Sequence, residues 1–67
     1  MPDQNTAKRL KQLRTKSGLT QRALAKKAGL HTNSYAKIER GERQPTSETI
    51  KKLSKALGVM ASDILGY

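Results

Sequence analysis

The sequence has no cysteine, tryptophan or phenylalanine and no long apolar run. The absence of cysteine excludes a disulfide framework, a thiolate metal site and a cysteine nucleophile. The apolar runs are far shorter than the ~18 residues that a bilayer-spanning helix needs. A chain of 67 residues also supplies too small a core to hold a strained catalytic pocket. These absences indicate one small domain, residues 1–67, that is neither an enzyme nor a membrane-spanning protein.

The cellular location is indicated by absences as well. The first residues contain no basic stretch followed by 7–15 apolar residues, so the sequence predicts no signal peptide. A cytoplasmic location is therefore expected, although a chain without thiols is indifferent to the redox state of its compartment.

Positive charge dominates the composition. Fourteen Lys and Arg residues oppose five Asp and Glu residues, which gives +9 with the single histidine neutral. Such a charge on a short chain points to a polyanionic partner: nucleic acid, an acidic membrane surface or an acidic protein. The basic residues alternate with leucines and alanines instead of forming a tail, so they belong to folded elements. The simpler interpretation is a basic surface that only keeps the domain soluble.

Apolar residues recur at helical spacing along the whole chain, and no segment shows the alternation of a strand. Caps and glycine stops predict helices within residues 5–18, 20–29, 31–41, 46–58 and 59–65. Asn5 or Thr6 would cap the first, Thr20 the second and Thr46 the fourth, whereas Met60 stands where a Ser or Thr cap is preferred. The pattern predicts an all-α fold, a compact four- to five-helix bundle. The residues expected on the inner faces are Leu10, Leu13, Ser17, Leu24, Ala25, Ala28, Tyr35, Ile38, Ile50, Leu53, Ala56, Leu57, Ile64 and Leu65.

The second and third predicted helices are joined by a turn of the length found in helix-turn-helix units. Ala25 is small enough for two helices to cross closely, and Gly29 permits the positive φ of a sharp turn. Leu30, Tyr35 and Ile38 would anchor the third helix from beneath. Its outer side would then carry polar or small side chains that fit a groove ~12 Å wide and meet base edges. These are Thr32, Asn33, Ala36, Lys37 and Arg40.

The stretches QRALAKKAGL (21–30) and YAKIERG (35–41) resemble the phage Cro/repressor type, or XRE-like, helix-turn-helix regulators. The similarity continues through RGERQPT (40–46), Thr49-Ile50 and ALGV (56–59), and covers nearly the whole chain. One piece alone would be a weak signal, but the combined spacing is a strong one. The resemblance implies a lambda-repressor-like DNA-binding fold, with the helix-turn-helix at about 20–40 and recognition helix 31–40.

The resemblance also implies roles for individual residues. Gln21, at the start of the second helix, and Arg43, in the loop after the third, would contact DNA phosphates. Arg14 and Glu39 would form a partly buried, structural ion pair. The base contacts would be made by Thr32, Asn33, Ala36 and Lys37, with Ala36 touching a thymine methyl group. Arg22, Lys26 and Lys27 are expected to form an exposed basic stripe, from which Arg22 would contact a phosphate. His31, in the turn, would contact a phosphate or lie beside a base edge.

Two residues depart from the family pattern, and several have plainer interpretations. His31 stands where the family has a Ser or Thr cap, and Tyr35 stands where Ile or Val is usual, so its hydroxyl needs a partner or an exposed edge. Thr32 could equally cap the helix or contact a phosphate. The other plain interpretations are a solvated helix face for Asn33 and Lys37, a surface turn for His31, and solubility for Arg22, Lys26 and Lys27.

The sequence therefore predicts a transcriptional regulator that binds double-stranded DNA sequence-specifically. A monomer of this size covers few base pairs, so we expect a homodimer, however weak, on a palindromic operator with half-sites ~34–36 Å apart. The interface is expected from the end of the chain: Val59, Met60, Ile64, Leu65 and Tyr67. No cofactor, metal ion or small-molecule substrate is expected.

Other classes of function stay open at this point. The same fold serves as an antitoxin-type module that binds a toxin partner as well as its operator. A membrane-surface binder could use the basic first helix, but that helix has no Trp or Phe for the interface. An enzyme is disfavoured because His31 lacks metal-ligand partners and no nucleophile with an orienting acid is present.

Overall fold

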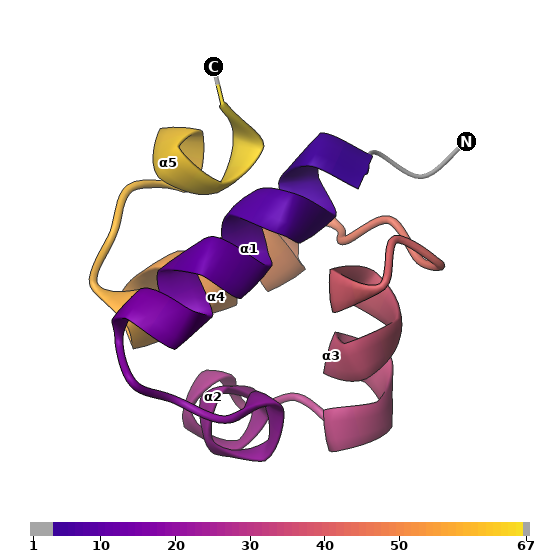
Figure 1. Ribbon diagram of the computed structural model, residues 1–67, viewed down its shortest axis with the longest axis vertical. Coiled ribbons are helices and arrows are strands. Elements are labelled where there is room, and N and C mark those ends of the chain that lie inside the picture. Colours follow the sequence, from indigo (N-terminus) through magenta and orange to yellow (C-terminus); the bar gives the residue numbers. More distant parts are fainter. Residues whose placement is uncertain (1–3, 67) are drawn as a thin grey trace.

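A computed structural model describes residues 4–66, and this part of the chain forms five helices and no strand (Figure 1). The helices are α1 (Gln4–Lys16), α2 (Gln21–Ala28), α3 (Thr32–Glu39), α4 (Ser47–Leu57) and α5 (Ala61–Leu65). The predicted all-α bundle of four to five helices is confirmed.

The helices surround one hydrophobic core. α2 packs against α3 and α4, while α1 packs against α3 and α5, so the first and last helices are neighbours. α2 and α3 together form one corner of the molecule (Figure 1). Arg9 Nη1 donates a hydrogen bond to the Leu65 carbonyl oxygen at 3.2 Å, which ties α1 to the end of α5. The core cluster consists of Leu10, Leu24, Ala25, Ala28, Tyr35, Ile38, Ile50, Leu53, Ala56 and Ile64.

Two of the predicted helix caps are present. Thr20 Oγ1 accepts a hydrogen bond from the Ala23 amide at 3.0 Å, and Thr46 Oγ1 accepts one from the Thr49 amide at 3.1 Å. A side-chain oxygen at this position satisfies an amide that has no partner within the helix. These contacts fix the starts of α2 and α4, where the sequence predicted them.

The ends of α1 differ from the sequence-based prediction. The helix begins at Gln4, so Asn5 and Thr6 lie inside its first turn and neither is the N-cap. The helix ends at Lys16, and Ser17, expected on the inner face, is exposed. The helical periodicity that selected Ser17 no longer applies where the chain turns toward Gly18, which has a φ of 75°.

The start of α5 shows how a helix can begin without a Ser or Thr cap. Met60 is the N-cap residue, and its backbone amide donates to the Asp63 carboxylate at 2.9 Å. A carboxylate in the first turn also interacts favourably with the helix dipole. Asp63 therefore compensates for the missing cap.

Candidate nucleic-acid interface

The turn between α2 and α3 sets the direction in which α3 projects. Gly29 has a φ of 74°, in the left-handed region that glycine adopts without a steric penalty. The next amide, Leu30 N–H, donates to the Ala25 carbonyl oxygen at 2.8 Å and closes α2. Ala25 is fully buried, and Leu30 packs against the core as expected. The chain thus forms a helix-turn-helix unit within residues 20–40.

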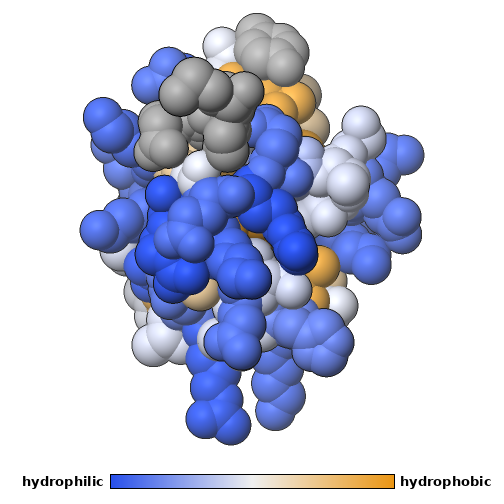
Figure 2. Space-filling model, turned by 90° about the vertical axis from the view of Figure 1, so that its right-hand side faces the viewer, coloured by the Kyte–Doolittle hydropathy of each residue, from blue (hydrophilic) through white to orange (hydrophobic). Residues whose placement is uncertain are grey.

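α3 has one buried side and one solvent-facing side. Tyr35, Ile38 and Glu39 are buried, whereas Thr32, Asn33, Lys37 and the following Arg40 are exposed. Figure 2 shows the side of the molecule on which α3 lies, and its surface is predominantly hydrophilic. The predicted outer side of this helix therefore carries donors and acceptors that solvent, or a ligand, can reach.

Ala36 is the exception on the predicted outer side. Only 9% of its surface is exposed, so its methyl group presents little area to a ligand. Thr32 is the first residue of α3, and His31 is the N-cap. The suggestion that Thr32 caps the helix is therefore wrong, and the His31 side chain makes no capping hydrogen bond.

The Arg14–Glu39 pair that the resemblance implies is present and joins α1 to α3. Arg14 Nε and Nη2 donate to the two Glu39 carboxylate oxygens at 2.8 Å each, and Arg14 Nη1 donates to the Leu19 carbonyl oxygen at 2.8 Å. Only 13% of the Arg14 side chain and 3% of the Glu39 side chain are exposed. A bidentate pair of this kind is geometrically specific, so it fixes α3 relative to α1.

The charge on Glu39 is stabilised in spite of its burial. Burial by itself raises the pKa of Glu39, but the hydrogen bonds that the carboxylate accepts, led by those from Arg14, hold its pKa below the ordinary value of 4.5. The same carboxylate raises the pKa of Arg14. Both groups are therefore charged at neutral pH.

Gln21, predicted to contact a phosphate, is already engaged at one atom. Its Nε2 donates to Glu39 Oε1 at 3.2 Å, so the first residue of α2 is connected to the end of α3. A side-chain amide nitrogen carries two hydrogens, and one of them remains for a ligand. This contact between α2 and α3 was not visible in the sequence, because the two residues are 18 positions apart.

The Tyr35 hydroxyl has neither of the two environments expected for it, a hydrogen-bond partner or an exposed edge. The side chain is fully buried, and its oxygen has no hydrogen-bond partner among the described residues. Burial raises the pKa of Tyr35 far above its ordinary value of 10, and the negative charge of Glu39 adds to this effect. The hydroxyl is therefore neutral and contributes an unsatisfied polar group to the core.

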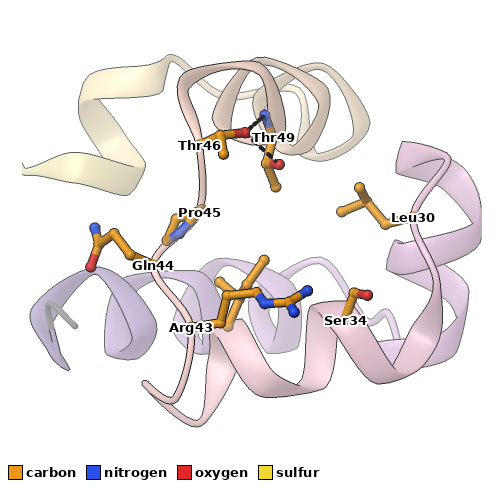
Figure 3. Close-up of a pocket in the computed structure, with 8 residues that line it drawn as sticks. Leu30, Ser34, Arg43, Gln44, Pro45, Thr46 and Thr49 are labelled. Atoms are coloured by element: carbon orange, nitrogen blue, oxygen red, sulfur yellow. Dashed lines mark hydrogen bonds between the residues drawn. The ribbon is translucent and has the colours of Figure 1, made fainter. Parts of the chain in front are cut away.

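Of the remaining predicted phosphate contacts, Arg22 and His31 are exposed on α2 and at the start of α3. Arg43 is exposed in the loop between α3 and α4, where it lines a groove of about 380 Å³. Figure 3 shows its guanidinium group extending over this groove toward Ser34. The apolar side chains Leu30 and Ile38 also line the groove. Arg43 thus lies beside α3, on the side that faces the start of α4.

The residues predicted for a dimer interface are in different environments. Met60 is 71% exposed, and Val59 and Leu65 are partly exposed. Ile64 is fully buried in the core of the monomer, so its inclusion in the interface was wrong: it presents no surface to a partner. Tyr67 lies outside the described residues.

One ion pair beside α3 was not anticipated. Arg40 Nε donates to Glu42 Oε2 at 2.5 Å, and both side chains are about half exposed, at 54% and 55%. Sequence reasoning placed Arg40 on the outer side of the helix but gave Glu42 no role. The available signal was a pair of opposite charges on the two sides of Gly41, a residue whose φ is 78°.

Other kinds of site are not found in the part of the chain that the structure describes. No group of three or more His, Cys, Asp or Glu residues within 4–66 is placed to hold a metal ion. Within the same residues, no helix is both long and apolar enough to cross a membrane.

Comparison with known proteins identifies relatives along most of the chain. The helix-turn-helix family model matches residues 10–63. Control protein C.BamHI from Bacillus amyloliquefaciens is 40% identical over 60 residues, which cover 88% of this chain and 74% of that protein. The HTH-type transcriptional regulator ImmR from Bacillus subtilis (strain 168) is 39% identical over 59 residues, and this chain spans 46% of its length.

A solved structure agrees with both the fold and the sequence similarity. The restriction-modification controller protein C.AhdI from Aeromonas hydrophila matches with a TM-score of 0.89 and 34% sequence identity. The match covers 91% of this chain and 92% of that one.

Proposed function

This chain belongs to the helix-turn-helix family of DNA-binding transcriptional regulators, and from that premise we propose that it binds a specific palindromic operator as a homodimer. The observation that carries the proposal is the two-sided character of α3. Its inner side chains are in the core, while Asn33 and Lys37 are exposed one helical turn apart. A rigid helix with polar side chains on its outer side fits the major groove.

Recognition of the operator would use two kinds of contact, with phosphates and with bases. Phosphate contacts set the position of the protein on the duplex, and base contacts read the sequence. We assign the phosphate contacts to Gln21, Arg22, His31 and Arg43. We assign the base contacts to Thr32, Asn33 and Lys37, with a smaller contact from the Ala36 methyl group. Asn pairs well with adenine and Lys with guanine, so both can discriminate between bases.

The dimer would form through the C-terminal end of the domain. Met60 is exposed at the start of α5, and a groove of about 350 Å³ lies nearby, lined by Pro45, Ile50, Ala61 and Leu65 among others. Val59 completes the apolar surface that we assign to the interface. The formal charge of +9 on each chain opposes association, so DNA, which neutralises this charge, would strengthen the dimer.

The relatives are transcriptional regulators, so we place the protein in the cytoplasm with its DNA and assign it no catalytic activity. No observation favours the antitoxin alternative.

Selection of bound fragments from a random duplex library tests the proposed recognition. We expect an inverted repeat whose half-sites lie about one helical turn apart. Affinity for the selected site should fall steeply with salt, with a log–log slope that changes by about one unit for each phosphate contact removed. Recovery of unenriched library sequences would contradict sequence-specific binding.

Sedimentation with and without the selected duplex tests the dimer. Met60→Ser is a suitable variant, because it removes apolar surface while placing a preferred residue at the N-cap of α5. We expect it to keep its thermal stability and to dimerise more weakly on the operator. A strict monomer, both free and on a palindromic duplex, would rule out the proposed assembly.

A further inference from the structure

The Arg40–Glu42 pair lies at the edge of the proposed DNA-binding surface. Arg40 follows α3 directly, and at helical spacing it shares the outer side with Asn33 and Lys37. Glu42 is brought back toward the helix because its amide donates to the Lys37 carbonyl oxygen at 2.9 Å. The turn at Gly41 makes this reversal possible, so the loop places a carboxylate beside the cations of the recognition helix.

The pair is not positioned to stabilise the fold. Both side chains are about half exposed, and exposed ion pairs contribute little to folding because water and salt screen them. Arg40 holds the pKa of Glu42 below its ordinary value, and the charge of Lys37 acts in the same direction. The Glu42 carboxylate is therefore charged and oriented. It lies on a surface where a negative charge opposes binding to phosphates.

The atoms that remain available have a definite pattern. Arg40 uses Nε in the pair, which leaves the terminal nitrogens Nη1 and Nη2 as donors. Glu42 uses Oε2, which leaves Oε1 as an acceptor. In the major groove a G·C pair presents two acceptors on guanine, N7 and O6, next to one donor on cytosine, N4. The pair thus offers two donors beside one acceptor, which complements this edge.

We propose that Arg40 and Glu42 form a single reading unit for one G·C base pair, in which Arg40 donates to guanine and Glu42 accepts from the cytosine amino group. The proposal rests on the DNA-binding function proposed above and adds two residues to it. A phosphate is the poorer ligand, because the pair has no net charge and the carboxylate repels an anion. Glu42 also holds the Arg40 side chain in place, which lowers the entropy lost on binding.

The test compares operators selected by the parent protein and by Glu42→Gln. Glutamine keeps the shape but replaces one of the two acceptor oxygens with an NH2 donor, which would face either Arg40 or the cytosine amino group, donor against donor. We expect the preference for G·C at one operator position to fall about tenfold, the size of a typical base contact. Affinity for an unrelated duplex should stay constant or rise, and the thermal unfolding midpoint should not change.

Two further variants separate this role from a general effect of charge. Arg40→Gln should lose the same preference, and the double variant should lose little more than either single one, since the two residues act together. Glu48→Gln is the matched control: it removes the same charge from an exposed pair with Lys52 on α4, where the Nζ–Oε1 distance is 3.7 Å. It should leave the base preference unchanged.

Each other outcome has a distinct meaning. If Glu42→Gln selects the same operator as the parent, or raises affinity for every duplex with unchanged base preference, the reading unit does not exist and the proposed function survives. If the parent itself selects no sequence, the proposed function fails, and this inference fails with it.

Discussion

Glu39 and Arg40 are consecutive residues at the end of α3, yet each belongs to a different ion pair. The Arg14–Glu39 pair is nearly buried, with 13% and 3% of its side chains exposed, whereas the Arg40–Glu42 pair is about half exposed. Successive helix residues point in directions about 100° apart, so one step along the chain moves the side chain from the core to the solvent. The same two residue types therefore stabilise the fold on one side and, on the other, form the exposed pair to which we assign DNA recognition.

The two pairs also differ in how they are surrounded. Glu39 accepts hydrogen bonds from Arg14 and Gln21, so its carboxylate connects three helices. Glu42 connects Arg40 only to the loop that follows it. Removal of a residue from the first pair leaves a buried charge without its partner, and removal from the second leaves a charge in water.

The largest expected effect comes from breaking the buried pair. Arg14→Ala should lower the free energy of unfolding by about 3 kcal/mol, since Glu39 would remain buried and uncompensated. Urea unfolding followed by circular dichroism measures this loss. Arg14→Lys, which keeps the charge but not the bidentate geometry, should lose less.

The matched change in the exposed pair is Arg40→Ala, which should leave the urea midpoint nearly unchanged. Equal losses of stability for Arg14→Ala and Arg40→Ala would show that burial does not distinguish the two pairs.

Acid should weaken the buried Arg14–Glu39 pair and so lower the stability of the fold. The pKa of Glu39 is lower in the folded protein than its ordinary value of 4.5, so its contribution is complete above that value and is lost as the pH falls through the folded pKa. Unfolding titrations between pH 7 and 3 should show stability decreasing below about pH 4.5, and Glu39→Gln should flatten this decrease. An equally steep decrease in Glu39→Gln would assign the acid sensitivity to another group.

A smaller effect on stability is expected at Tyr35, which is buried beside the Arg14–Glu39 pair. The Tyr35 hydroxyl is buried without a hydrogen-bond partner among the described residues. Tyr35→Phe removes this unsatisfied group with little change of shape, so the free energy of unfolding should rise by about 1 kcal/mol. Thermal unfolding at pH 7 checks the direction, and a large loss of stability would show that the hydroxyl has a partner in solution.

Local signals in the sequence were sufficient for most of the fold. The threonines at positions 20 and 46 and the glycines at 29 and 58 marked helix ends because capping depends on residues close in sequence. The core of α2 to α4 followed from helical spacing in the same way. Ser17 was misplaced because periodicity does not show where a helix stops.

The site could be predicted less completely, because it depends on contacts between distant residues. The exposure of Asn33 and Lys37 followed from the phase of one helix. Ala36 has the same phase but is largely covered, and Ile64 is absorbed into the core. The covering of Ala36 cannot be read without knowing which helices pack together, whereas the burial of Ile64 was expected from helical spacing and conflicts only with its assignment to the interface. The carboxylate of Glu42 reaches Arg40 only because the loop folds back on α3.

The central claim is that the exposed side of α3 reads DNA, and Lys37→Ala tests it most directly. The measurement is the ratio of dissociation constants for the selected operator and a scrambled duplex at fixed salt, with Lys55→Ala on α4 as the control for loss of one charge. We predict that Lys37→Ala raises this ratio toward one, by a factor equivalent to about 1–3 kcal/mol of discrimination, and relaxes base preference at one position, with an unchanged thermal midpoint. An unchanged ratio in Lys37→Ala, or an equal change in Lys55→Ala, would contradict the claim.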